Sequence, residues 1–281
     1  MNTKHTPVME QEVMEALEIE NGKRYIDGTA GQLGHFNKIR ELGGTVLGLE
    51  YDPDQIAQAK TTIGASPDAK LVQGNFANIY EIAQHESFTN VDGVLLDLGI
   101  SYRQLAAGGK GLSYKNDTEP LDMRLTAESQ GTAAEILGTA TEEELYTIFA
   151  RLSEEPLSQR IAHAVVQYRV RTPLRTVQDL KAVVDSVTES PDNHVYGRIF
   201  QALRMYINNE LDNLKNGFVG ALQVLRSGGV LVIITFQSLE DRAVKQLIRT
   251  HQQLISKDWK VKKKQARSFE RSAIVRIIKK K

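Results

Sequence analysis

The stretch RYIDGTAGQLGHF, residues 24–36, joins a short apolar run to a glycine-rich turn and the start of a helix. Its three glycines, Gly28, Gly31 and Gly34, stand at the spacing G-x-x-G-x-x-G. The helical pattern runs on to Leu42, where a pair of glycines ends it. The stretch therefore predicts a strand, a turn that admits a ligand, and a helix, which together make the first unit of an α/β sheet.

The same alternation of strand and helix continues in the residues that follow. Apolar runs of strand length lie at 45–52 (TVLGLEYD), 70–76 (KLVQGNF) and 91–99 (VDGVLLDLG). A helix is predicted at 53–63, because Pro53 is tolerated in a first turn. The run at 91–99 is almost wholly apolar, as in a strand buried on both faces. This β-α-β-α-β order predicts an α/β fold with a doubly wound parallel sheet.

Helical periodicity replaces the strand pattern in the middle of the chain. Thr141 with Glu144, and Thr176 with Asp179, form the pattern of a helix start capped by a hydroxyl and a carboxylate. A longer periodic stretch runs from Arg198 to about residue 225. We interpret residues 106–200 as an inserted helical domain that recognises the substrate.

The α/β pattern returns after the insertion. A strand is predicted at 230–236 (VLVIITF), then a helix that starts at Ser238 and is capped by Asp241, then a last strand at 271–279 (RSAIVRIIK). The sheet domain is therefore expected to comprise residues 1–105 and 201–281, on both sides of the insertion.

Acidic and aromatic residues follow the first four strands at the points where a doubly wound sheet binds its ligand. Asp27 ends the first strand and Glu50 ends the second, whereas Phe76 follows the third and Asp97 ends the fourth. Glu50 follows Gly28 by 22 residues, the interval at which such folds hold a ribose with a carboxylate. These residues predict a nucleoside-binding site.

The glycine spacing discriminates between cofactors. Thr29 and Ala30 separate the first two glycines, so the G-x-G-x-x-G fingerprint that holds a pyrophosphate is absent. S-adenosylmethionine (SAM) has no phosphate and fits better, with Glu50 on the ribose hydroxyls, Phe76 on the adenine and Asp97 on the ammonium group. The alternative is that the glycines only form a turn, Phe76 is a core residue and Asp97 caps a loop.

The composition excludes several classes of site and indicates a charged partner. The chain has no cysteine, which excludes disulfides, thiolate metal sites and cysteine nucleophiles and fits a cytoplasmic location. No apolar run is long enough to span a membrane.

Residues 257–281 hold eleven Lys and Arg against two acids, a balance of +9, so the rest of the neutral chain carries −9. This basic end, with Arg169, Arg171 and Arg175, indicates a polyanion such as RNA, the alternative being an edge strand kept soluble by lysines.

Seven motifs lie in a fixed order along nearly the whole chain. They are KHTPVMEQEVMEAL at 4–17, YIDGTAGQLGHF at 25–36, VDGVLLDLGIS at 91–101, EPLDMR at 119–124, RIFQALRMYINNEL at 198–211, TFQSLEDRAVK at 235–245 and RSAIVRI at 271–277. In this order they resemble the motifs of the bacterial 16S rRNA cytosine-N4 methyltransferase family.

The resemblance implies a Rossmann-like class I SAM-dependent methyltransferase sheet with an inserted helical domain. It implies SAM as the cofactor, no metal, no membrane, and small-subunit rRNA or the 30S particle as the partner. The implied reaction is methylation of N4 of a cytidine in the decoding region, cytosine 1402 of 16S rRNA. The SAM contacts that it implies are Leu33, Gly34, His35, Glu50, Phe76, Asp97 and Gln104.

Three of the departures from the family pattern bear on activity. Leu33 replaces a glycine before the loop histidine, Phe36 replaces a serine after it, and Gln237 replaces a histidine. They motivate a second hypothesis, a catalytically weakened paralogue that binds RNA as an assembly factor. The third hypothesis, a nicotinamide-dependent oxidoreductase, is disfavoured by the glycine spacing. Asp97 and Ser101 are candidates for accepting the amine proton, but the sequence assigns no catalytic residue.

Overall fold

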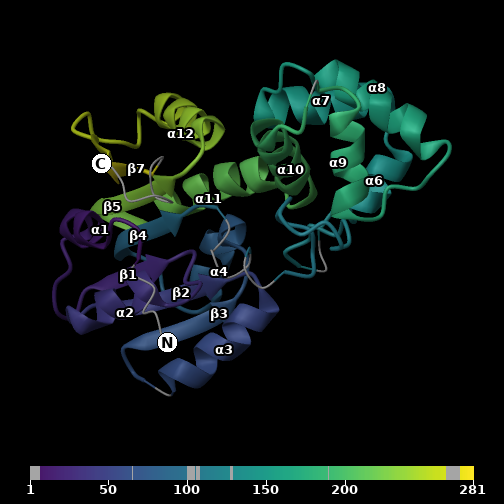
Figure 1. Ribbon diagram of the computed structural model, residues 1–281. Coiled ribbons are helices and arrows are strands. Elements are labelled where there is room, and N and C mark those ends of the chain that lie inside the picture. The colour runs from purple at the N-terminus through teal and green to yellow at the C-terminus, as the bar shows by residue number, and fades with distance from the viewer. Residues whose placement is uncertain are drawn as a thin grey trace. The chain divides into compact units, whose positions relative to one another are not determined.

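A computed structural model describes residues 7–64, 66–99, 105, 108–126, 129–188, 190–263 and 273–281. The chain divides into two compact units, a sheet unit of Met1–Gly99 and Leu211–Lys281 and a helical unit of Ile100–Glu210. The helical unit follows β4 (Val91–Asp97) in the chain, and α11 (Glu210–Val224) leads into β5 (Leu225–Thr235), as Figure 1 shows. The predicted helical insertion is therefore present between the fourth and fifth strands.

Seven strands of the described residues form one mixed sheet in the order β3-β2-β1-β4-β5-β7-β6. β1 to β5 are parallel, whereas β7 is antiparallel to both β5 and β6. The order reverses between β1 and β4, the switch point at which such sheets bind ligands. This is a class I methyltransferase strand order, so the predicted fold class is confirmed. The remaining strands are β1 (Arg24–Asp27), β2 (Thr45–Glu50), β3 (Ala69–Gln73), β6 (Lys260–Lys263) and β7 (Ile274–Lys279).

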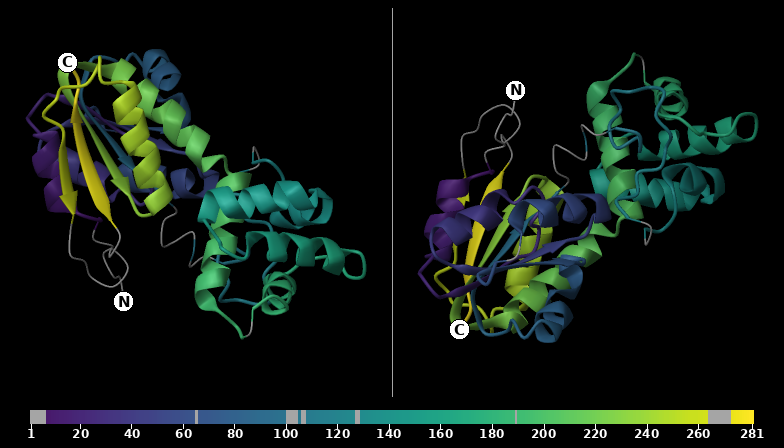
Figure 2. Two further views of the ribbon diagram at one scale, coloured as in Figure 1. Left: turned by 90° about the horizontal axis from the view of Figure 1, so that it is seen from above. Right: turned by 90° about the horizontal axis from the view of Figure 1, so that it is seen from below.

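Helices cover both faces of the sheet, as a doubly wound fold requires (Figure 2). Neighbouring residues of β1 point to opposite faces, because side chains alternate along a strand. Ile26 joins the core that contains Phe218, whereas Tyr25 joins the core that contains Phe36. The helices of this unit are α1 (Glu10–Leu17), α2 (Gly34–Glu41), α3 (Pro53–Ile63), α4 (Ile79–His85), α11 and α12 (Ser238–Thr250), with a 3-10 turn, η1 (Phe76–Asn78).

The helical unit has an apolar core of its own, which includes Leu145, Phe149 and Leu180. The two predicted capping pairs are confirmed, because Thr141 and Glu144 begin one helix and Thr176 and Asp179 begin another. The helices are α6 (Ala133–Thr139), α7 (Glu142–Ser153), α8 (Ser158–Arg169), α9 (Val177–Asp185) and α10 (Asn193–Ile207).

The long periodic stretch from Arg198 to residue 225 is two helices rather than one. α10 ends at Ile207, Asn209 adopts a left-handed conformation with φ 50°, and α11 begins at Glu210. Apolar periodicity continues across this break because both helices bury one face, so the pattern alone does not reveal it. β5 also begins at Leu225, before the predicted position at residue 230.

The prediction that Ser238 and Asp241 cap this helix is wrong. The N-cap of α12 is Gln237, whose backbone N–H donates to Glu240 at 3.1 Å. Asp241 is instead buried and accepts from Arg276 of β7 at 2.8 Å. Glu240 and Asp241 both lie at a spacing that a capping pattern allows. Only the bond from Arg276 to Asp241 shows that Asp241 is not the capping residue.

Candidate functional site

Three acids lie together at the carboxyl ends of the central parallel strands. Asp27 ends β1, Glu50 ends β2 and Asp97 ends β4. β1 pairs in parallel with both β2 and β4, so these ends share one edge of the sheet at the switch point. The sequence predicted this juxtaposition from the strand order.

Thr29 ties the glycine turn to the strands on either side. Its backbone N–H donates to Oδ1 of Asp27 at 3.1 Å, and its hydroxyl accepts the backbone N–H of Asp97 at 2.8 Å. The N–H of Gly31 donates to Oε2 of Glu50 at 2.8 Å. The turn is therefore held in one conformation by the strand ends that carry the acids.

Glu50 is held with both carboxylate oxygens in use. Oε2 accepts from Gly31, and Oε1 accepts the backbone N–H of Asp52 at 2.7 Å. Burial raises the pKa of Glu50, although these backbone donors oppose the shift. Each carboxylate oxygen retains a second acceptor site, so Glu50 can still take two ribose hydroxyls.

Leu33 and Gly34 are packed into the protein rather than presented on the turn. Leu33 is the N-cap of α2 with φ 66°, and its side chain is 3% exposed in an apolar core. A Cβ on Gly34 would lie 2.5 Å from Cγ of Pro7, so glycine is needed there for the approach of the N-terminal segment. Any contact of Leu33 with a ligand would therefore be made through its backbone.

His35 is buried behind the acids. Its Nε2 lies 3.0 Å from the carbonyl of Val8, which requires the proton on Nε2, and its Nδ1 lies 3.7 Å from Oδ2 of Asp97. The ring thus connects the N-terminal segment to the end of β4. This buried position suits a residue that shapes the turn better than it suits a general base open to substrate.

Phe76 is half-buried beneath the turn. A Cβ on Gly28 would lie 3.3 Å from Cβ of Phe76, and a Cβ on Gly217 of α11 would lie 2.4 Å from the ring. The two glycines therefore make room for this side chain, and one side of the ring belongs to the core. Gln104 and Ser101, which the sequence also named, lie outside the described residues.

Asp97 has a carboxylate oxygen whose hydrogen-bonding capacity is unused in the site. Its Oδ1 is buried with no hydrogen-bond partner among the residues that the structure describes, while 24% of the side chain is exposed. Burial raises its pKa well above the usual value, and Asp27 and Glu240 raise it further. A buried carboxylate in this state favours a cationic partner.

Asp27 and Glu240 complete a group of buried carboxylates around Asp97. Asp27 is 1% exposed, and burial, with a smaller contribution from Glu50, raises its pKa to about 7. Glu240 is 4% exposed at the start of α12 and accepts the backbone N–H of Phe236 at 2.9 Å. Sequence reasoning missed Glu240, because the capping pattern was assigned to Asp241. Its position three residues after Gln237 was the available signal.

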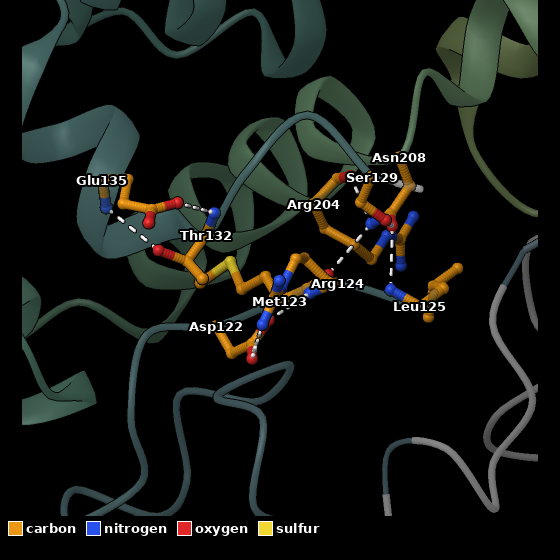
Figure 3. Close-up of polar contacts among 9 residues, drawn as sticks. All are labelled: Asp122, Met123, Arg124, Leu125, Ser129, Thr132, Glu135, Arg204 and Asn208. Carbon is orange, nitrogen blue, oxygen red and sulfur yellow. Dashed lines mark hydrogen bonds and ion pairs between the residues drawn. The ribbon is translucent and has the colours of Figure 1, made fainter. Parts of the chain in front are cut away.

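The EPLDMR motif forms a fixed loop in the helical unit (Figure 3). Arg124 donates two bonds to Asp122, at 2.7 and 2.9 Å. Asn208, at the end of α10, donates to the carbonyl of Met123 at 2.9 Å and accepts the N–H of Leu125 at 2.9 Å. The buried amide of Asn208 thereby joins the EPLDMR motif to the RIFQALRMYINNEL motif. Asn208 follows Arg124 by 84 residues in the chain.

The described residues lack two further features. They contain no group of three or more His, Asp or Glu arranged to hold a metal ion. None of their helices is long and apolar enough to cross a membrane.

The strand order, with its row of buried acids at the switch point, defines the class of the protein as a methyltransferase of class I architecture. More narrowly, the chain belongs to the MraW methylase family, whose model matches residues 2–281.

Relatives that carry the name "Ribosomal RNA small subunit methyltransferase H" include proteins from three bacteria. The relative from Xanthomonas oryzae is 40% identical, over 87% of this chain and 73% of its own length. The relative from Deinococcus deserti is 39% identical, over 87% of this chain and 81% of its own. The relative from Thermomicrobium roseum is 40% identical, over 89% of this chain and 78% of its own.

Proposed function

We propose that this chain is a SAM-dependent methyltransferase that acts on small-subunit ribosomal RNA. The observation that carries the proposal is the family match over residues 2–281, with relatives 39–40% identical that are named for this activity. As the acceptor we propose N4 of a cytidine in the decoding region of 16S rRNA, the reaction that the sequence motifs imply.

The buried acids fit the charges of SAM. Oδ1 of Asp97, which has no partner among the described residues, would take the ammonium group, and Glu50 would take the ribose hydroxyls. The exposed side of Phe76 would lie on the adenine, and the backbone of Leu33–His35 would border the methionine end. When bound, SAM supplies an electrophilic sulfonium methyl group.

The chain's own contribution to the reaction is position and electrostatics. The amine of cytosine is a weak nucleophile because its lone pair is delocalised into the ring. Holding that amine in line with the methyl group therefore supplies much of the acceleration. The base must be single-stranded or turned out of its stack to reach this edge of the sheet. Asp97 and its carboxylate neighbours favour the cationic donor there, and Thr29 fixes the backbone of Asp97.

A catalytically weakened paralogue is the second candidate. The observation that favours it is the conformation of Leu33, which is left-handed at φ 66° in the turn that the resemblance assigns to SAM. Such a backbone is costly for leucine and available to glycine. A turn held this way by a buried side chain is less free to adjust to a ligand.

The test is transfer of labelled methyl from SAM to small ribosomal subunits that lack the modification. We expect transfer by the wild-type chain and loss of most of it in Glu50→Gln and Asp97→Asn. Glu50→Gln should weaken SAM binding about tenfold or more, because charged hydrogen bonds are worth roughly 1.5–3 kcal/mol. Matched controls are Glu81→Gln on α4 and Asp54→Asn on α3, both exposed in the sheet unit. Binding of SAM without any transfer would favour the paralogue.

A further inference from the structure

The helix α12 presents only basic charges to solvent. Arg242, Lys245 and Arg249 are exposed and lie along one side of the helix at the spacing i, i+3, i+7. Its two acids, Glu240 and Asp241, are 4% and 5% exposed. The acids are held inside by the start of the helix and by Arg276, so the side chains that α12 exposes to solvent are basic, and one of them, Lys245, also pairs with Asp241.

Trp259 lies beside this helix, immediately before β6 at the edge of the sheet. Its side chain is 38% exposed. The guanidinium carbon of Arg276 lies over the indole ring, 5.6 Å from its centroid. Arg276 is itself 2% exposed and paired with Asp241. One face of the indole is thus backed by a rigid buried ion pair, and the ring is fixed at the surface.

Arg276 of β7 links the tryptophan to the helix. Asp241 bonds Arg276 on the sheet and Lys245 on the helix, at 2.8 Å to each. The α12–β6 surface, which we define as Arg242, Lys245, Arg249 and Trp259, is therefore one patch. Lys260 is exposed at its rim, and Asp258 is the acid exposed beside the tryptophan.

An exposed aromatic ring with a row of cations is the arrangement that single-stranded nucleic acid requires. Bases stack on the aromatic ring whatever their sequence, and the cations follow the phosphates. Duplex RNA keeps its bases stacked and hides them from such a ring. An acidic peptide would use the cations but not the ring.

We propose that the α12–β6 surface binds a single-stranded segment of RNA, with one base stacked on Trp259. The proposal rests on the proposed function and names a surface for the RNA that flanks the target base. β6 is antiparallel to β7 and therefore parallel to β4, so it runs toward the edge of the sheet that carries Asp97. With strands about 4.8 Å apart and a rise of about 3.3 Å per residue, Trp259 lies roughly 17 Å from the end of β4. A short stretch of extended RNA spans that distance.

Trp259 reports on its own contact, because it is the only tryptophan in the chain. The full chain is titrated with a single-stranded RNA of about twelve nucleotides, a duplex of equal length and poly-glutamate. We expect the single strand to quench the tryptophan fluorescence and the other two to leave it nearly unchanged. Equal quenching by the duplex or by poly-glutamate would overturn the proposal.

Variants separate the ring from the charges. Trp259→Ala should weaken single-strand binding about tenfold, and Trp259→Phe should retain it, because stacking needs a ring. The double variant Arg242→Gln with Arg249→Gln should lower the slope of log affinity against log salt by about 1.4, at about 0.7 per contact. The matched control is Lys60→Gln with Lys215→Gln, two exposed lysines on α3 and α11. Wild-type affinity in Trp259→Ala would refute the stacked base.

Methyl transfer distinguishes this failure from failure of the proposed function. If the wild-type chain methylates RNA and Trp259→Ala does so with an unchanged KM, the surface is wrong and the function stands. If the wild-type chain shows quenching but no transfer, the surface stands and the enzymatic function fails. SAM affinity should be the same in all these variants.

Discussion

At the scale of single residues, Leu33 shows a local conflict that the fold tolerates. A left-handed leucine costs roughly 1–2 kcal/mol, whereas removing a buried leucine side chain costs about 2–5 kcal/mol. Burial is the larger effect, which explains how leucine persists where the family pattern has glycine. We expect Leu33→Gly to lower the free energy of unfolding by about 1–3 kcal/mol in thermal denaturation. A higher melting temperature for the variant would contradict this balance.

Asp27 gives the sheet unit a pH dependence. Its pKa rises from 3.8 to about 7 on folding, so the folded state holds this proton more tightly. The contribution of Asp27 to stability therefore falls as pH rises from about 4 to 7, by at most about 4 kcal/mol at 1.36 kcal/mol per pKa unit. Asp27→Asn keeps an acceptor for Thr29 and carries no charge.

The variant Asp27→Asn should therefore melt at a higher temperature than the wild type at pH 8 and at about the same temperature at pH 4. Thermal denaturation at the two pH values measures the difference. A variant that is less stable at pH 8 would show that Asp27 is ionised at little cost in the folded chain.

At the scale of elements, Arg169 holds the helical unit together. Its guanidinium donates to the carbonyls of Leu137 and Ala140, at 2.8 and 2.7 Å, at the end of α6. Arg171, in the turn between α8 and α9, is exposed. The sequence showed only that both residues are basic and did not reveal their different roles. We expect Arg171, the exposed one, to bind RNA and Arg169 to stabilise the fold.

Arg169→Ala should destabilise the helical unit by about 1–3 kcal/mol, the cost of leaving partly buried carbonyls unpaired. Arg171→Ala should be within about 0.5 kcal/mol of the wild type and should weaken RNA binding. Chemical denaturation followed by RNA titration compares them. Equal destabilisation by the two substitutions would reject this assignment.

Asn208 fixes the EPLDMR loop from the end of α10. Its side chain bonds Met123 and Leu125, and Met123 is held at φ 61° inside the core. Asn208→Ala would leave these backbone groups unpaired, so we expect a loss of about 2–4 kcal/mol in unfolding free energy. SAM affinity should change less than twofold, because Glu50 and Asp97 lie in the other unit. A tenfold loss of SAM affinity with an intact fold would contradict this.

The sequence predicted the sheet well for a physical reason. Apolar runs that end on acids mark buried parallel strands, and those at β1, β2 and β4 were located from local pattern alone. The break between α10 and α11 at Asn209, and the use of Glu240 rather than Asp241 to cap α12, depend on tertiary contacts. Local periodicity carries no information about those contacts. β6 was predicted only as an alternative, an edge strand kept soluble by lysines, because lysines at an edge strand resemble a solvated tail.

At the scale of the whole molecule, the neutral net charge conceals two opposite regions. The switch point holds buried acids that favour a cationic cofactor, and the α12–β6 surface holds exposed cations that favour RNA. The two regions belong to the same sheet unit and serve the two substrates of the proposed reaction. SAM binding should therefore depend little on salt, and RNA binding should depend on it strongly.

The most direct test of the central claim is to locate the methyl group. Small subunits from a strain that lacks the modification are incubated with the chain and SAM, and the 16S rRNA is digested and mapped by mass spectrometry. We predict one added methyl on N4 of a decoding-region cytidine, and none with the Asp97→Asn variant. Unmodified cytidine under conditions where calorimetry shows SAM bound would contradict the account.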